Sequence, residues 1–416
     1  MQILPLPVLG RKLKNTVNED GETVSNAADK IAEANNAYGA NDTETLLGDS
    51  AEALETAGID DIKLSVGAGY GGLEDKNGNK ISQITVNITG SKINAGNNVT
   101  ANATETDNIN MTLGSGAAGA AAVNAGVGIL NVNRNVGVNI TGGSINADKV
   151  DVGADISGST ELNVYQGSAG VISGNVAYAS ISTNGNSDIT LEGVNLTAKD
   201  INAIAKDTTT TNLNAIGVSA GGVALGALSA EAVNNSDISI TLTGNTVTSE
   251  SEADDEESGN INISTDKANT VAAEAIGVAG GAIGGTGMGA TVSDNGSSVI
   301  TLIGNTMQAD KNIDVAAQTN SELTANINND AAGVFASGAV SIATVNAGTE
   351  TDHMITSVDI SAGNVFTAEN TSFDAKSAIT QDIDMLALSL SGYVAIGGNT
   401  TTTSCLCGCN HNRRCI

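Results

Sequence analysis

Five residues of the kind that bind metal ions lie together at the carboxyl end of the chain. All four cysteines and one of the two histidines fall within residues 405–416: Cys405, Cys407, Cys409, His411 and Cys415. Thiolate and imidazole are good zinc ligands, but this spacing fits neither paired C-x-x-C hooks nor a zinc knuckle. We therefore predict no metal site and interpret residues 405–416 as a disordered, non-native or out-of-frame tail, with a metal cluster as the open alternative. Because no cysteine precedes residue 405, the body of the protein does not depend on disulfides.

A second group of ligand-type residues is acidic. The segment Glu250–Ser258 holds six carboxylates, and its densest cluster is Glu252, Asp254, Asp255, Glu256 and Glu257. Calcium takes carboxylate oxygens, so weak calcium binding at Glu250–Glu257 stays open, but no glycine-bearing calcium loop organises these residues and a solvated corner loop is the expectation. The whole chain has 46 Asp and Glu against 17 Lys and Arg, a formal net charge of -29. Such a surface excludes nucleic acid as a natural partner.

Signals for catalysis and for a cofactor are weak. His353 lies in the polar segment TDHM without a recognisable partner, and the chain has no Trp, three Phe and five Tyr, so it lacks the aromatic platforms of β-helical glycosidases. Gly67–Gly72 reads GAGYGG and matches the dinucleotide fingerprint, but the residues after it indicate a turn and a strand instead of a helix. We predict that the protein is not an enzyme and has no catalytic, cofactor-binding or metal-binding residue.

These residues sit in a chain built of repeats. In the segment from Asp188, Ile189 and Leu191 alternate with polar residues, the period-2 pattern of a strand with one buried face. Six segments share this plan: ITVNITGSKINAG from Ile84, VGVNITGGSINAD from Val136, DITLEGVNLTAKD from Asp188, SITLTGNTVTSES from Ser239, VITLIGNTMQADK from Val299 and SVDISAGNVFTAE from Ser357. The first five share a glycine, at spacings of 52, 51, 51 and 60 residues: Gly90, Gly142, Gly193, Gly244 and Gly304. Repetition at a fixed period predicts a stacked array.

Composition indicates which array this is. The chain has 50 Gly but only two Pro, both before residue 8, and continuous backbone pairing requires such a scarcity of proline. We therefore predict an all-β protein, a right-handed parallel β-helix with a small helical or irregular N-terminal segment. If each unit makes two coils of about 25 residues, six units give about twelve coils and a rod roughly 60 Å long. The expected domains are an irregular segment 1–20, a short helical segment 21–60, β-solenoid repeats 61–404 and the tail 405–416.

Each unit also contains an uncharged Gly/Ala segment, for example IGVSAGGVALGAL from Ile216. Residues 114–132 form an uncharged run nineteen residues long, and Gly222–Gly226 spells G-x-x-x-G, both of which also occur in packed membrane helices. Leucine is scarce, glycine weakens helices, and no aromatic belt frames these segments, so no stable membrane insertion is expected. We predict strands in which both faces are occluded, whereas Thr190 faces solvent.

The repeat has a family likeness. The alternation of ITLxGNxxxAxxxxINxxA units with GVxAGGVAxG units, in an acidic chain poor in aromatic residues, resembles the filamentous-haemagglutinin-like adhesins of Gram-negative bacteria, and the leukotoxin-type filamentous adhesins most of all. The resemblance covers about residues 60–400 and implies a right-handed β-helix, two-partner (type V) secretion and display on the cell surface. No N-P-N-[LG] secretion motif and no carboxy-terminal β-barrel anchor are recognisable, so we expect an internal piece of a longer protein.

The resemblance implies the function of a structural stalk and adhesive repeat region, which takes part in virulence by attaching the bacterium to host or neighbouring cells. The expected partners are a host-cell or matrix receptor or glycan and, for the full-length protein, an outer-membrane two-partner secretion transporter. Two alternatives stay open: a β-helical carbohydrate-active protein such as a polysaccharide lyase, hydrolase or phage tailspike, and a membrane-active leukotoxin fragment. A cleft of converging carboxylates and basic residues would favour the carbohydrate-active protein, and a uniform surface would favour the stalk.

Overall fold

The computed structural model describes residues 16–17, 23–24, 62–72, 83–251, 258–348 and 353–405, and in them the secondary structure is β-strand without helix. Two short strands, β1 (Thr16–Val17) and β2 (Thr23–Val24), pair antiparallel. Every other strand pairs in parallel, which confirms the predicted all-β solenoid. Apart from Thr23–Val24, the segment 21–60 predicted as helical lies outside the described residues.

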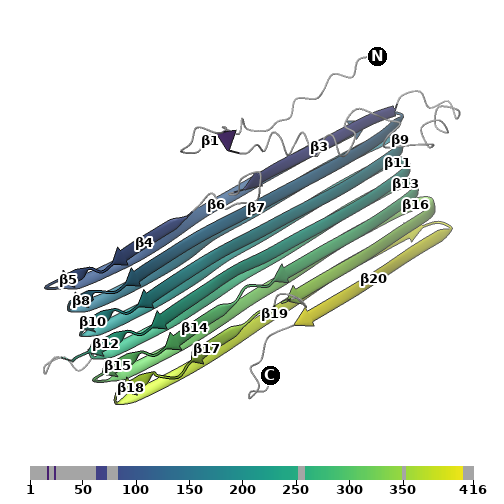
Figure 1. Cartoon of the computed structure of the whole chain (residues 1–416). Coiled ribbons are helices and arrows are strands. Elements are labelled where there is room, and N and C mark those ends of the chain that lie inside the picture. Colours follow the sequence, from purple (N-terminus) through teal and green to yellow (C-terminus); the bar gives the residue numbers. More distant parts are fainter. Residues whose placement is uncertain are drawn as a thin grey trace.

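One coil of the solenoid consists of two long legs and a short strand. In one coil the legs are separate strands of 21 residues each, β6 (Asn98–Ala118) and β7 (Ala121–Thr141). The next strand, β9 (Lys149–Glu192), pairs with β6 through its first half and with β7 through its second half. A long strand such as β9 therefore includes an outbound leg, a reversal and a return leg. We call the reversal the tip and the opposite end, where the short strand lies, the base (Figure 1).

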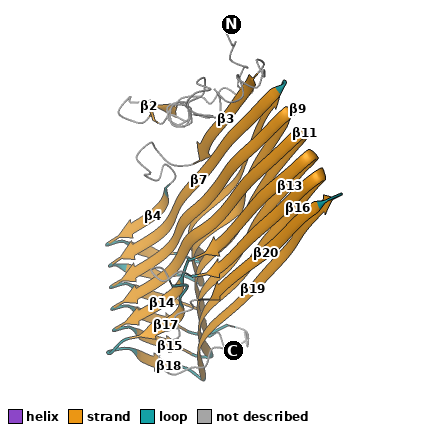
Figure 2. Ribbon diagram, turned by 90° about the vertical axis from the view of Figure 1, so that its right-hand side faces the viewer, coloured by secondary structure: helices purple, strands orange, loops and turns teal. Residues whose placement is uncertain are grey.

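The remaining strands repeat this arrangement. The legs of the other coils are β3 (Ile62–Gly72), β4 (Ile84–Thr89), β11 (Asp200–Thr243), β13 (Asn260–Asp294), β14 (Ser298–Ile303), β16 (Asn312–Ala347), β17 (Thr356–Ile360), β19 (Asn370–Ser391) and β20 (Val394–Cys405). The short strands are β5 (Lys92–Asn94), β8 (Ser144–Asn146), β10 (Asn195–Ala198), β12 (Thr246–Ser249), β15 (Thr306–Ala309) and β18 (Val365–Thr367). The short strands form a separate 6-stranded sheet along the base (Figure 2).

The register corrects the predicted number of coils. Lys149 pairs with Asp200 and Asp200 with Asn260, so successive coils are 51 and 60 residues apart, and each repeat unit makes one coil instead of two. Each 21-residue leg extends about 70 Å, whereas the stack of coils is only about 30 Å high. The molecule is a flat blade and not the predicted 60 Å rod of twelve coils (Figure 1).

Corners at the base depend on the common glycine of the repeat. Its φ angle is 59°, 63°, 63°, 64° and 62° at Gly90, Gly142, Gly193, Gly244 and Gly304. This left-handed conformation is open to glycine but strained for residues with a side chain. Next to it, Asn245 and Asn305 form a buried ladder: the amide N–H of Asn245 donates to Asn305 Oδ1 at 2.9 Å, and Asn305 Nδ2 donates to the carbonyl of Leu242 at 2.8 Å. The dipeptide Gly-Asn thus satisfies the backbone polar groups of the corner.

A second column of glycines forms the reversal at the tip. A Cβ atom added to Gly170, Gly221 or Gly281 would lie 2.3, 2.1 and 2.0 Å from the carbonyl oxygen of the glycine in the coil before it: Gly119, Gly170 and Gly221. These distances leave no room for a side chain. The reversal skips one pair of the ladder, since Gly221 pairs with Gly170 and Val223 with Ile172. It also shifts the alternation by one residue, because in β11 the odd-numbered residues are buried up to Ser219 and even-numbered residues are buried from Ala224.

Side chains between the two legs form two hydrophobic clusters. The base cluster contains Ile189, Leu191 and Ile240, and the arm cluster, nearer the tip, contains Leu213 and Leu323. The alternation predicted from Asp188 onward is confirmed, since Ile189 and Leu191 are buried and Thr190 between them is partly exposed. Buried polar residues separate the two clusters.

Candidate functional surfaces

The outer surface near the base is a set of polar ladders. Asn262 Nδ2 donates to Asn202 Oδ1 at 3.0 Å, and Asn202 Nδ2 donates to Asp151 Oδ1 at 2.8 Å. On the return leg, Asn295 donates to Asn235 at 2.8 Å and Asn235 to Asn184 at 2.9 Å. Equivalent positions of successive coils are 51 to 60 residues apart, so each repeat adds one rung to the same ladder. This part of the surface is regular and hydrophilic.

A shallow hollow of about 200 Å³ interrupts the outbound face where Gly153 lacks a side chain. Its lining includes Asp151, Asp155 and Lys206. Burial raises the pKa of Asp155, the nearby Lys206 opposes this rise, and Asp207 adds to it. Asp151 is already bound, because it accepts from Asn202 and lies 3.0 Å from Lys149 Nζ. The hollow can therefore offer a protonatable carboxyl and an ammonium group to a hydroxyl-rich ligand.

The outer surface at the tip is apolar. On the return legs, Val176, Leu225, Val340 and Ile396 are 54, 53, 48 and 63% exposed. At the reversal, Phe335 stacks on Tyr393 with ring centroids 5.9 Å apart. We call these six residues, together with Val171 and Val334, the apolar tip. Exposed apolar patches beyond a few hundred Å² are unusual on monomeric proteins and mark interaction sites.

The interior of the tip is polar and narrow. Ser168 and Ser219 share a hydrogen bond of 3.2 Å, and Ser219 Oγ donates to the carbonyl of Leu225 at 2.8 Å. Ala224 is fully buried, but its neighbour Leu225 is exposed. The prediction that both faces of the Gly/Ala segments are occluded was wrong: the inner face is occluded by the opposite leg, and the outer face is open.

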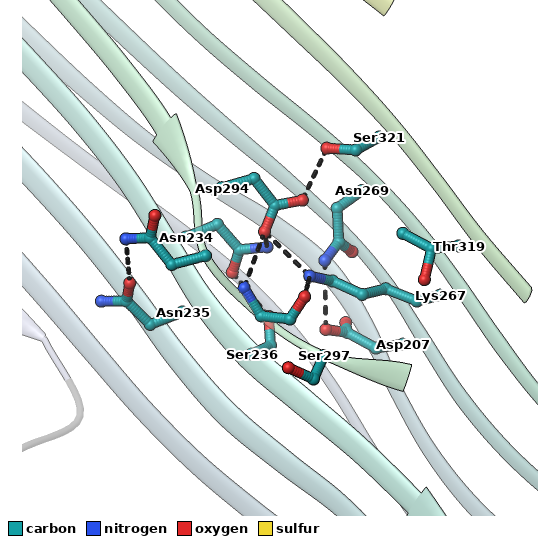
Figure 3. A network of polar contacts seen from close by, with 12 residues as sticks. Asp207, Asn234, Asn235, Ser236, Lys267, Asn269, Asp294, Ser297, Thr319 and Ser321 are labelled. Carbon is teal, nitrogen blue, oxygen red and sulfur yellow. Dashed lines mark hydrogen bonds and ion pairs between the residues drawn. The ribbon is translucent and has the colours of Figure 1, made fainter. Parts of the chain in front are cut away.

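Between the base and arm clusters, buried polar side chains form a layer that we call the polar seam (Figure 3). Its principal members in three adjacent coils are Asp207, Asn234, Lys267, Asn269, Asp294 and Ser321, all with relative exposure of 2% or less. Lys267 Nζ donates to Asp294 Oδ1 at 2.8 Å, and Asp294 Oδ2 accepts from Ser321 Oγ at 2.6 Å. Asn269 Nδ2 donates to Asp207 Oδ2 at 3.4 Å. Such a network favours one register of the coils, because a slipped coil would leave buried charges unpaired.

A second ion pair extends the polar seam toward the amino terminus. Arg134 Nη1 lies 3.2 Å from Asp107 Oδ1, with 1 and 15% side-chain exposure. Burial raises the pKa of Asp107, and the Arg134 guanidinium partly offsets the rise. Like Lys267 and Asp294, these residues come from the outbound and return legs of one coil, 27 residues apart.

The structure places several residues that the sequence singled out. The GAGYGG segment lies inside β3, paired residue by residue with β7, and not at the start of a helix. Residues 114–132 belong to β6 and β7 apart from the two residues 119–120 between them, and among the described residues we find no apolar helix of membrane-spanning length. His353 is exposed, and so is Cys405.

The acidic residues 252–257 and the tail residues 406–416 lie outside the described residues. Among the described ones, no group of three or more His, Cys, Asp or Glu is arranged to hold a metal ion.

The sequence reasoning missed the charged members of the polar seam. The alternation of the strand indicates that Lys267 is buried. Ile261, Ile263, Thr265 and Lys267 follow one another at intervals of two residues in β13, so all four side chains point inward. A lysine at an inward position requires a buried partner. Which residue supplies that partner depends on where the chain reverses. A one-residue shift of the alternation marks that reversal in β13, where inward positions are odd-numbered up to Ala279 and even-numbered from Gly284.

Comparisons of the chain with protein-family models, with curated proteins and with solved structures gave no match.

Proposed function

We propose that this chain is the structural and adhesive repeat region of a bacterial surface filament that attaches the cell to a host cell, a matrix component or a neighbouring cell. The observation that supports this proposal is the in-register stacking of long legs, in which β9 and β11 pair over 43 residue positions from Asp200↔Lys149 to Thr243↔Glu192, with one irregularity near Gly222. Stacking of this kind allows a chain to be lengthened by adding coils, because each coil contacts only its neighbours.

The proposed contact surface is the apolar tip. It repeats along the stack at the end farthest from the acidic corner loop, so it can approach an apolar or neutral receptor surface without strong charge repulsion. The proposed location is the bacterial cell surface after two-partner secretion, with an outer-membrane transporter as the export partner. The polar ladders of the base remain hydrated and keep the filament soluble.

Beads carrying the full chain test this proposal on cultured epithelial cells and on immobilised matrix proteins and glycans. We expect binding that the triple variant Val176→Ser, Leu225→Ser, Val340→Ser reduces at least tenfold. A matched triple at partly exposed base positions, Thr190→Ser, Thr241→Ser and Thr301→Ser, should bind like the wild type. Wild-type beads that bind no better than beads carrying an unrelated protein of equal net charge would refute the adhesive role.

The hollow at Gly153 favours one alternative, a carbohydrate-active protein. Asp155 would be the acid, because burial raises its pKa, and Lys206 would orient the substrate. Incubation of acidic polysaccharides with the full chain, followed by a reducing-end assay, distinguishes the two functions. Product release by the wild type that is lost in Asp155→Asn would support the enzyme over the stalk.

A further inference from the structure

Among the described residues, the ion pair that is most completely shielded from solvent joins the two legs of one coil. Lys267 on the outbound part of β13 faces Asp294 on its return part, Nζ to Oδ1 is 2.8 Å, and both side chains have 0% exposure. Lys199 and Asp148 lie almost as close, at 3.1 Å, but are 29 and 45% exposed. The buried pair thus has an amine and a carboxyl group in contact at a site from which water is excluded.

We propose that Lys267 and Asp294 condense to an intramolecular isopeptide bond. Proton transfer from the Lys267 ammonium to Asp294 gives a neutral amine and a carboxylic acid, the two forms that react. The nitrogen lone pair then attacks Cγ of Asp294. The N–C bond forms, the bond from Cγ to Oδ1 breaks, and one water molecule leaves, so the reaction needs no oxidant, reductant or cofactor.

The geometry supports this attack. Because Cγ is bonded to Oδ1, the 2.8 Å contact keeps Nζ within about 4 Å of Cγ, and holding two reacting groups together in this way replaces a bimolecular encounter by an intramolecular step. A second contact, from Nζ to the carbonyl of Gly296 at 2.7 Å, limits rotation of the lysine side chain. The reacting atoms are therefore held together by two independent contacts.

Hydrogen-bond donors surround the carboxyl group of Asp294. Ser321 Oγ donates to Oδ2 at 2.6 Å, and Oδ2 would become the carbonyl oxygen of the new amide. The Gly296 N–H and Asn234 Nδ2 donate to Oδ1, each at 3.3 Å. Donors aimed at a carboxyl oxygen stabilise the negative charge that develops on it during the attack.

The remaining proton has a direct route. As the bond forms, the nitrogen passes a proton to the departing Oδ1, which it already contacts at 2.8 Å, and Oδ1 leaves as water. Asp207, the buried pairing partner of Lys267 in the adjacent coil, accepts hydrogen bonds from Thr209 and Asn269 (Figure 3). The product would be a covalent brace between the two legs, which closes the tip and arm of this coil into a ring.

Mass spectrometry of the full chain tests the proposal. In the linked protein the intact mass is lower by one water molecule. Between Asp207 and Lys311 the only tryptic site is Lys267, so digestion of the denatured linked protein should yield a single peptide 207–311. An unlinked protein would instead give the separate peptides 207–267 and 268–311 at the full mass, and that result from the wild type would overturn the proposal without recourse to any variant. Cleavage after the exposed Lys199 is the internal control.

Site-directed variants test which residues form the isopeptide bond. Lys267→Arg and Asp294→Ala should both retain the full mass, because each removes one reacting group. The matched control is Thr319→Val, a buried position of the polar seam whose hydroxyl contacts Thr356 and not the pair; it should be linked like the wild type. A peptide linked through a different lysine would overturn the assignment of Lys267.

Discussion

The base and the tip of the blade are made from the same strands but have opposite polarity. In β11 the inward residues are Ile201, Ala203 and Ala205 near the base but Ser219 at the tip, while the outward side changes from Asn202 to Leu225. The alternation in and out shifts by one residue at the reversal: odd-numbered residues face inward up to Ser219, and even-numbered residues face inward from Ala224. Within each leg, strand periodicity specifies which side a residue faces, but it does not specify which side is apolar.

The difference follows from the space between the legs. At the base the short strands form a third wall, and the interior holds isoleucine and leucine. At the tip only two walls meet, and a Cβ atom on Gly217 would lie 2.6 Å from Asn175 and 3.0 Å from Leu228 of the facing leg. Large side chains at the tip fit only on the outside, where they form the apolar tip.

The largest expected effect contrasts the two regions directly. Ile240→Ala removes a fully buried side chain of the base cluster and should lower the free energy of unfolding by about 2–5 kcal/mol. Leu225→Ala at the apolar tip should cost about 1 kcal/mol or less, because its side chain is half exposed. Urea denaturation of the two full-length variants measures both values. Equal losses would mean that Leu225 is covered by a partner in solution.

A second test concerns the reversal at the tip. Gly221→Ala would place a Cβ atom 2.1 Å from the backbone oxygen of Gly170 and should destabilise the coil by about 1–3 kcal/mol. The control is Gly280→Ala, at the position before the glycine column in the next coil, where an added Cβ would meet nothing within 4 Å. Thermal unfolding followed by circular dichroism compares the two variants. Similar midpoints would show that the glycine column is loosely packed.

The interior of the tip should also resist larger side chains. Ala224→Leu inserts three carbons at a position with 0% exposure and should cost about 1–3 kcal/mol through overpacking. Thr190→Leu, on the outer face of the same leg of the preceding coil, should change stability by about 0.5 kcal/mol or less. A negligible effect of Ala224→Leu in urea denaturation would contradict the narrow interior.

The hollow at Gly153 predicts a smaller, pH-dependent effect. Because burial raises the pKa of Asp155 in the folded state, the folded protein binds the proton more tightly than the unfolded chain. The stabilisation is present below the pKa of the unfolded aspartate and is lost as the pH rises through the folded pKa. Asp155→Asn should therefore reduce the decline of the urea midpoint across the acidic range. An unchanged pH profile would show that Asp155 is solvated.

The smallest effect is expected at the acidic corner. β12 ends at Ser249 and β13 begins at Asn260, so deletion of residues 250–258 would leave one linking residue, as Lys199 is between β10 and β11. The deletion removes the hydrogen bonds of Ser251 to Asp310, at 2.8 and 3.0 Å, which are exposed to solvent. We expect the thermal midpoint to change by no more than a few degrees, since solenoids tolerate loop changes. A larger fall would show that the corner loop packs on the blade.

Local signals in the sequence determined the strands, the inward parity of Ile189 and Leu191, the glycines of the base corners and the corner position of the insertion after Ser249. Each depends on period-2 alternation or on one backbone conformation, and both are local properties. Only the tertiary structure decided that one unit makes one coil, that the outer face of the tip is apolar, and that Lys267 meets Asp294 across 27 residues. The physical reason is that each of these features depends on residues far apart in the chain. The alternation shifts by one residue at the glycine reversal, which is a local signal, but which residues the two legs then bring face to face is not local.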